Sequence, residues 1–243
     1  MNNYIKPSWP APNNIHAYTT TRRNGCSQAP YQSFNLADHV GDNPIAVQKN
    51  REQLKAELQL PNEPKWLQQI HSNIVISNDL PNSTPADAAY TKNSDVVCTV
   101  LTADCLPILV ANKQGTKVAA IHAGWRSLAN SLIENTIHSI GNNNLLIWLG
   151  PAIGPTAFEV GRDVYQIFTD HDPAAKQAFT KIDNNKWLAD IYLLATQRLN
   201  KLGVYDIYGG DFCTYTDQHD FYSYRREDLT GRMASLIWIA NSN

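Results

Sequence analysis

The sequence lacks the features that identify several common classes of protein. In its 243 residues no apolar run approaches the ~18 residues of a transmembrane helix. The N-terminal stretch MNNYIKPSWPAP has no basic head followed by an apolar segment, so we expect no signal peptide. Basic and acidic residues nearly balance, 20 against 22, and the net charge of −2 argues against nucleic-acid binding or a polybasic membrane surface. We therefore expect a soluble, cytoplasmic protein that binds neither nucleic acid nor membrane.

Several motifs that would announce a function are also missing. The chain contains no GxGxxG, no GxxxxGK[ST], no HExxH and no HxH pair among its seven histidines. Cysteines are few: Cys26, Cys98, Cys105 and Cys213. Because nothing indicates secretion, we expect free thiols or metal ligands rather than disulfides.

The stretch from Asp95 to Ser127 is the most informative part of the chain. Its apolar runs predict three strands, over 96–101, 105–111 and 118–123. Gly124 ends the third run, and an apolar pattern of helical period follows over 128–140, with Gly141 placed to cap it. Open α/β sheets bind ligands where a strand feeds such a turn. Cys105 and His122, at the strand ends, therefore mark a predicted site.

The flanking segments supply further elements of an α/β fold. Asn43 and Pro44 predict a helix that begins there and ends before Pro61. Strands are predicted over 16–21, 66–70, 74–76 and 145–149, a loop over 81–85, and a helix over 187–202. A further apolar run covers 234–240. With no linker or repeat in the sequence, we expect a single domain spanning 1–243.

His71, Cys105 and His122 could together bind a metal. Each follows or ends a predicted strand, and a catalytic zinc site uses three such ligands with one open position. Their spacings, 34 and 17 residues, match no compact zinc-finger pattern. From spacing alone, His122 is equally well a core histidine, His71 a loop residue and Cys105 a small buried side chain.

Three blocks of the sequence resemble the YfiH-type family. They are Gln68-Gln69-Ile70-His71, Thr102-Ala103-Asp104-Cys105-Leu106-Pro107 and His122-Ala123-Gly124-Trp125-Arg126. Further matching blocks run from Ser33-Phe34-Asn35-Leu36 to Tyr222-Ser223-Tyr224-Arg225-Arg226 and Thr230-Gly231-Arg232. The family is called polyphenol oxidase or laccase-domain in older usage and purine nucleoside phosphorylase in newer usage. One departure is Ser127, where the family usually has glycine; a serine there could serve a helix N-terminus.

The resemblance implies a fold and an activity. It implies one α/β/β/α sandwich domain with mixed sheets, and a zinc ion held by His71, Cys105 and His122, which would also be the catalytic residues. The implied reactions are phosphorolysis of adenosine, inosine and S-methyl-5′-thioadenosine, and deamination of adenosine. Partners would be purine nucleosides and phosphate, and the protein a monomer or small homo-oligomer.

Phosphorolysis requires cations to hold phosphate, which suggests roles for residues beside these blocks. Arg51 and Arg126 are the candidates for phosphate, and Asn35 for a hydrogen bond to substrate. The structural alternatives are a solvated helix face for Arg51, an ion pair in the first turn of a helix for Arg126, and a loop turn for Asn35. Asp104 could orient a ligand or act as a base, and a local backbone cap is the structural alternative. Arg225, Arg226 and Arg232 could form a basic rim or pair with Glu227 and Asp228.

Two other enzyme classes compete with the zinc enzyme. A copper-dependent, laccase-like polyphenol oxidase fits the older family name, but its copper clusters need many paired histidines. A metal-free cysteine hydrolase would use Cys105 as nucleophile and His122 as base. A binding module without activity is the remaining alternative, although it gives no reason for Cys and His at strand ends.

Overall fold

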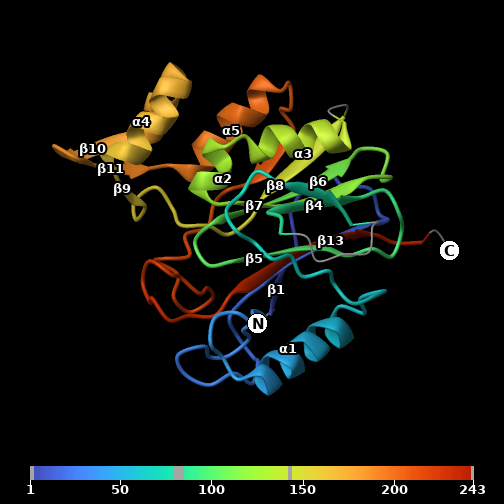
Figure 1. Cartoon of the computed structure of the whole chain (residues 1–243). Helices are drawn as coiled ribbons and strands as arrows, with labels where there is room; N and C mark the ends of the chain where they lie inside the picture. The colour runs from blue at the N-terminus through green and yellow to red at the C-terminus, as the bar shows by residue number, and fades with distance from the viewer. Residues whose placement is uncertain (1–2, 79–84, 142–143, 242–243) are drawn as a thin grey trace.

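Two stacked sheets with helices on both outer faces make up the computed structural model (Figure 1), which describes residues 3–78, 85–141 and 144–241. One helix, α1 (Pro44–Glu57), covers the outer face of a four-stranded sheet. The helices α3 (Leu132–Ile140) and α5 (Ile191–Lys201) cover the outer face of a six-stranded sheet. This layering confirms the predicted α/β/β/α sandwich.

The larger sheet mixes parallel and antiparallel pairs. Its order is β12 (Ile207–Gly209), β8 (Leu145–Leu149), β6 (Leu106–Asn112), β7 (Val118–Ala123), β4 (Ala88–Thr91) and β3 (Val75–Ser77). The two outer pairs, β12 with β8 and β3 with β4, are parallel, and the inner pairs are antiparallel. The larger sheet is therefore mixed, as expected.

The second sheet is antiparallel throughout, and a third, small one lies beside the helices. The second has the order β1 (Tyr4–Ile5), β2 (Ile15–Thr20), β13 (Met233–Ile239) and β5 (Cys98–Thr102). The small sheet has the order β10 (Phe179–Asp183), β11 (Lys186–Ala189) and β9 (Glu159–Gly161). It is accompanied by α4 (Arg162–His171) and a 3₁₀ helix over Pro173–Ala178.

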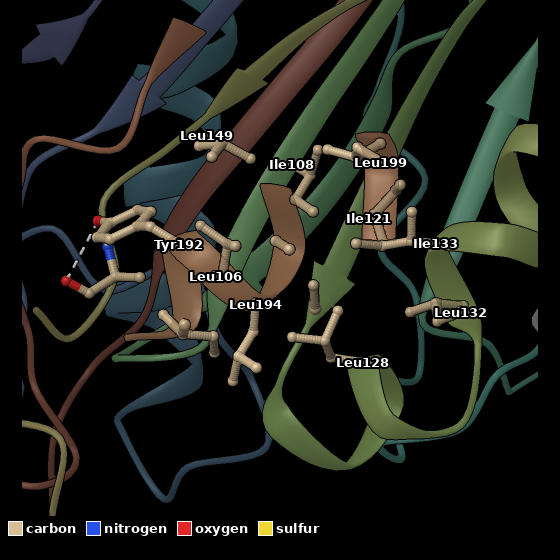
Figure 2. Packing of buried hydrophobic residues seen from close by; sticks show 14 of the residues in the cluster. Leu106, Ile108, Ile121, Leu128, Leu132, Ile133, Leu149, Tyr192, Leu194 and Leu199 are labelled. Atoms are coloured by element: carbon tan, nitrogen blue, oxygen red, sulfur yellow. Dashed lines mark hydrogen bonds between the residues drawn. The ribbon is translucent and has the colours of Figure 1, made fainter. Parts of the chain in front are cut away.

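Alternating side chains on β6 explain why both faces of the larger sheet are buried. Ile108 and Val110 pack against the helices, whereas Leu109 and Ala111 pack against the other sheet. Figure 2 shows the helix side, where Ile108 lies near side chains of α3 and α5. A strand buried on both faces reads as a continuous apolar run, which is the pattern the sequence shows.

The same alternation on β13 joins the other two layers. Leu236 and Trp238 face the cluster that contains Leu54 of α1, and Ile237 and Ile239 face the space between the sheets. The N-cap of α1 is as predicted, because the Asn43 side chain accepts a hydrogen bond from the Ile45 N–H.

The predicted strand over 66–70 is wrong. Residues 66–70 belong to no strand, and an isolated bridge joins the preceding residue, Lys65, to Cys98. Further along, the side-chain amide of Gln69 replaces the backbone pairing: its Nε2 donates to the Leu101 carbonyl (2.8 Å) and its Oε1 accepts from the Leu101 N–H (2.7 Å). The edge of β5 is thus satisfied by a side chain, and the segment remains a loop.

Two predicted helices are also corrected at their starts. Residues 187–189 belong to β11, and α5 begins only after Asp190, whose side chain accepts from the Leu193 N–H. The helix expected over 128–140 is divided into α2 (Trp125–Ala129) and α3, because Ser131 adopts a left-handed conformation with φ of 67°. An apolar period continues across such a break, so the pattern does not reveal it.

Two further expectations concern the loop over 81–85 and the absence of a membrane-spanning helix. Residues 81–84 of the predicted loop over 81–85 lie outside the described residues. In the described part of the chain no helix combines the length and the apolar character needed to cross a membrane.

Candidate metal centre and active site

His71, Cys105 and His122 converge in space. One potential ligand atom from each lies within 4.8 Å of the others, and the Cys105 Sγ is 3.8 Å from the His71 Nε2. The antiparallel pairing of β6 and β7 explains part of this, because it sets Leu106 opposite Ala123. Cys105, one residue before β6, and His122, near the end of β7, are brought to the same sheet edge.

Asp87 orients the His122 ring and holds the loop that carries His71. Its buried carboxylate accepts from the His122 Nδ1–H (2.8 Å) and from the backbone N–H groups of His71 (3.0 Å) and Ser72 (2.6 Å). The Ser72 hydroxyl adds a fourth hydrogen bond (2.7 Å). With its Nδ1 occupied, His122 presents Nε2 to Cys105 and His71, as metal-bound histidines do.

The backbone around the group is specialised. His71 and Asp104 have φ values of 58° and 84°, in the left-handed region that residues other than glycine rarely adopt. Gly124 leaves the space that the group needs: a Cβ there would lie 2.9 Å from the His71 Cδ2 and 3.0 Å from the Cys105 Sγ. Such strain and close approach are typical of functional sites.

These residues fit a zinc ion. Zinc–nitrogen and zinc–sulfur bonds of about 2.0–2.3 Å place tetrahedral ligand atoms about 3.4–3.6 Å apart. The observed 3.8 Å between sulfur and imidazole nitrogen is close to that separation. Two imidazoles and one thiolate would leave one position of a four-coordinate ion for water or substrate, and His71 is exposed whereas His122 is buried.

The electrostatics favour a thiolate. Burial would raise the pKa of Cys105, but His122 and His71 lower it to about 6. Burial lowers the pKa of His122, whereas Cys105 and Asp87 raise it, to about 9. Burial raises the pKa of Asp87, and the hydrogen bonds from His122 and Ser72 bring it down to about 2. The thiolate is the form of cysteine that binds metal and acts as a nucleophile.

The three ligands line a cavity of about 600 Å³, a size typical of small-molecule sites. Aromatic and apolar side chains contribute from Trp125, Ile153, Phe158 and Tyr224. Polar and charged lining comes from His39, Gln69, Arg126, Arg225 and Arg232. The cavity thus offers apolar surface for a flat ring and cations for an anionic group.

Of the proposed substrate-binding residues, the structure places only Arg126 in this lining. Arg51 instead donates to the Leu36 carbonyl (3.0 Å), approaches Asp38 (3.4 Å) and stacks on the Trp66 ring (4.2 Å to the centroid). These contacts hold α1 to the loop that precedes it.

Asn35 is completely buried and binds protein groups on every side. Its Oδ1 accepts from the N–H groups of Ala37 (3.0 Å) and Arg232 (2.9 Å), and its Nδ2 donates to the Ala37 carbonyl and to Asp42. It joins the N-terminal loop to the C-terminal one and lies outside the cavity lining.

Asp104 binds two positions of the C-terminal segment. Its two carboxylate oxygens accept from the Thr214 hydroxyl and the Arg225 N–H, both at 2.6 Å. Arg226 likewise donates to the carbonyls of Thr214, Tyr215 and Phe221 and is taken up by the loop. Ser127 is buried inside α2, and its hydroxyl has no partner among the described residues, so it caps nothing.

Three residues of the site, Asp87, Gln69 and His39, were not predicted from the sequence to have a functional role. Asp87 carried a usable signal, because a lone carboxylate between alanines at the start of a buried strand requires partners. Gln69 lies within the block that ends at His71, and no separate role was predicted for it. His39 stands in a segment without periodicity, so only the fold brings it to the cavity.

The fold and this site define a layered α/β protein with a candidate His–Cys–His metal centre. Residues 16–240 match the family model described as multi-copper polyphenol oxidoreductase laccase. The chain belongs to this family, the YfiH family.

Relatives and solved structures match over nearly the whole chain. The purine nucleoside phosphorylase YfiH of Escherichia coli is 49% identical over 98% of this chain and 100% of its own. A purine nucleoside phosphorylase of Haemophilus influenzae is 50% identical over 96% of this chain and 98% of its own. The crystal structure of Neisseria meningitidis protein NMB0706 is 46% identical, with a TM-score of 0.95 over 99% of this chain and 100% of that one.

Proposed function

We propose that the chain is a zinc-dependent purine nucleoside phosphorylase acting on adenosine, inosine and S-methyl-5′-thioadenosine. The observation that carries the proposal is the convergence of His71, Cys105 and His122 in the lining of a cavity of nucleoside size. The relatives that are about half identical over their full length, and are named purine nucleoside phosphorylases, support it. In this proposal residues 1–243 form one catalytic domain.

The reaction places defined demands on the cavity. An oxygen of phosphate forms a bond to C1′ of the ribose while the C1′–N9 bond breaks. The electron pair leaves with the purine, which takes up a proton, and the products are the free base and a ribose 1-phosphate. Trp125 and Phe158 offer ring faces for the purine, and the Arg126 guanidinium offers charge for phosphate.

We further propose that the same site deaminates adenosine. His71, Cys105 and His122 would hold the zinc ion, and when bound it would supply a Lewis acid for activating water. Zinc deaminases of nucleobases use a comparable set of His and Cys ligands. Water would replace the amino group at C6, and ammonia would leave.

The copper oxidase is less well supported by the donor set. Laccase chemistry uses several copper ions with many imidazoles. In the described part of the chain, His71, Cys105 and His122 form the one group of three or more potential ligands that could hold a metal ion. One such group matches a single ion.

The cysteine hydrolase has a specific observation in its favour. Cys105, His122 and Asp87 form a chain of nucleophile, base and orienting carboxylate, with a thiol of lowered pKa. The position of His71 favours the metal over this alternative. A hydrolase of this kind does not require a second imidazole 3.8 Å from the sulfur, held there by a left-handed backbone.

The site also suggests where the enzyme works. Cys105 must be a thiolate to bind metal, and it forms no disulfide in the described part of the chain. A reducing compartment preserves that state, so we propose a cytoplasmic location. We expect a monomer or a small homo-oligomer, with purine nucleosides and phosphate as partners.

Elemental analysis together with phosphorolysis tests the proposal. Purified protein should contain one zinc per chain and should convert inosine and phosphate to hypoxanthine and ribose 1-phosphate. Removal of the metal should abolish turnover, and zinc should restore it. Several copper ions per chain would support the oxidase instead, and full activity without metal would support the hydrolase.

A further inference from the structure

Three arginines line the cavity without a carboxylate partner in the part of the chain that the structure describes. Among the described residues, no carboxylate oxygen lies within 4 Å of the guanidinium nitrogens of Arg126, Arg225 or Arg232. Outside the lining, Arg22, Arg51, Arg198 and Arg226 each have a carboxylate at 2.6–3.7 Å, whereas the exposed Arg162 has none among the described residues. Three of the arginines without a carboxylate partner in the described part of the chain thus lie around the candidate active site.

Arg225 is held in place by neutral groups. Its backbone N–H donates to Asp104, and its Nη1 donates to the Glu159 carbonyl at 2.9 Å. Its guanidinium lies 5.7 Å from the centroid of the Phe158 ring. A carbonyl and a ring face fix the orientation of the guanidinium but leave its full charge and most of its five donors free.

Arg232 is anchored in the same way, deeper in the protein. Its backbone N–H binds Asn35, and its Nη1 donates to the carbonyls of Thr230 (2.8 Å) and Gly231 (2.9 Å). Burial lowers the pKa of its guanidinium, while Cys105 and Asp104 raise it. Arg232 is therefore partly removed from water. It also lies close enough to the candidate metal ligand Cys105 to interact electrostatically with the Cys105 thiolate.

Both oxygens of Asp104 accept hydrogen bonds from other groups, one from the Thr214 hydroxyl and one from the Arg225 N–H. Arg126 and Arg225 are exposed at the cavity, whereas Arg232 is half-buried. Withdrawing the Arg232 cation from water without a directly paired carboxylate is costly, and an anion bound in the cavity would offset that cost. Guanidinium groups are suited to this task because their paired N–H donors match the oxygens of phosphate.

We propose that Arg225 and Arg232 bind the phosphate co-substrate and, with Arg126, complete its subsite. This inference rests on the proposed phosphorylase activity. It gives the C-terminal segment 222–232 the role of holding the attacking anion beside the metal centre. It also gives Asn35 a positioning role, through the backbone of Arg232, in place of the direct substrate contact expected from the sequence.

The test compares Arg225→Gln and Arg232→Gln with Arg162→Gln, which changes an exposed arginine of α4 outside the cavity lining. Loss of a charge-assisted hydrogen bond should raise the KM for phosphate roughly 10- to 100-fold in the first two variants. Deamination of adenosine, which uses water, should keep its kcat and KM. Arg162→Gln should match the wild type in every assay.

Arg225→Lys and Arg232→Lys separate charge from folding, because lysine keeps the charge without the paired donors. They should restore part of the phosphate affinity. Titration calorimetry with inorganic phosphate alone, on protein of matched metal content, measures the subsite without turnover. Wild-type protein that binds phosphate through these arginines but performs no phosphorolysis would overturn the proposed function and leave the subsite standing. Phosphorolysis with an unchanged phosphate KM in both Gln variants would overturn the subsite alone. A wild type that neither binds phosphate nor uses it would overturn both.

Discussion

The carboxylate of Asp87 accepts the Nδ1–H of His122 at 2.8 Å, and both side chains are buried. The same carboxylate receives the backbone N–H groups of His71 and Ser72. One side chain thereby fixes the ring of one candidate ligand and the loop that carries another. Residues behind metal ligands commonly act in this way, by fixing the tautomer and orientation of the imidazole.

Asp87→Asn is expected to weaken metal binding roughly 10- to 100-fold while the fold persists. An amide oxygen in place of Oδ1 can still accept from His122 and His71, but the amide NH₂ then faces the donors of Ser72 and Ile70. Competition with a chromophoric chelator measures the affinity. The control is Asp206→Asn, which removes an exposed carboxylate paired with Lys113 at 2.7 Å. Equal zinc affinity in Asp87→Asn and the wild type would exclude this role.

Gly124→Ala should empty the metal centre. The backbone of Gly124 is extended (φ −61°, ψ 156°), so alanine is conformationally acceptable there. The added Cβ would meet the His71 ring at 2.9 Å and the Cys105 sulfur at 3.0 Å, and the ligands must move apart. Zinc content and phosphorolysis should fall together while far-UV circular dichroism stays native.

A matched change in the same segment is Ser127→Ala. It removes a buried hydroxyl that has no partner among the described residues, so zinc content and activity should be retained. The free energy of unfolding should stay the same or rise by up to about 1 kcal/mol. If Gly124→Ala binds zinc as well as Ser127→Ala does, the space at Gly124 serves another purpose.

Cys105→Asp distinguishes a metal ligand from a nucleophile. A carboxylate can bind zinc but cannot form a thioester, so a zinc enzyme should keep some metal and residual turnover. A cysteine hydrolase should lose all activity. Cys105→Ala, which removes both functions, gives the baseline for either mechanism.

Alkylation provides an independent measurement on the unaltered protein. Iodoacetamide should react slowly with Cys105 while zinc is bound and faster after the metal is removed, because ligation occupies the sulfur lone pair. Peptide mapping by mass spectrometry assigns the modified cysteine. Rapid inactivation of a zinc-free preparation that is fully active would favour the hydrolase.

Arg51→Ala should lower stability without a specific effect on phosphate. The change removes the hydrogen bond to Leu36, the contact with Asp38 and the stacking on Trp66, with an expected loss of about 1–2 kcal/mol in the free energy of unfolding. Denaturant unfolding measures the loss. A raised phosphate KM at unchanged stability would instead return Arg51 to the phosphate site.

Local patterns in the sequence determined much of the fold. Continuous apolar runs identified β6, β7 and β8, because strands buried on both faces show no alternation. Asn43 and Pro44 identified the start of α1. The wrong predictions lie where a single side chain determines the local structure. The Gln69 amide takes the place of a strand pairing, and Asp190 caps α5 so that the helix begins later than predicted. These effects depend on distant or single residues that no periodicity records.

The sequence also supplied the candidate ligands, since Cys105 and His122 end buried strands and His71 stands in a block that resembles the family. Their meeting depends on tertiary structure: the register of β6 against β7, and the hydrogen bonds that draw the His71 loop to Asp87. Tertiary structure likewise separated Arg51 and Asn35 from the cavity and brought Arg225 and Arg232 to it. The sequence does not distinguish an arginine that pairs with a carboxylate from one that lines the cavity. The difference depends on segments that are far away along the chain.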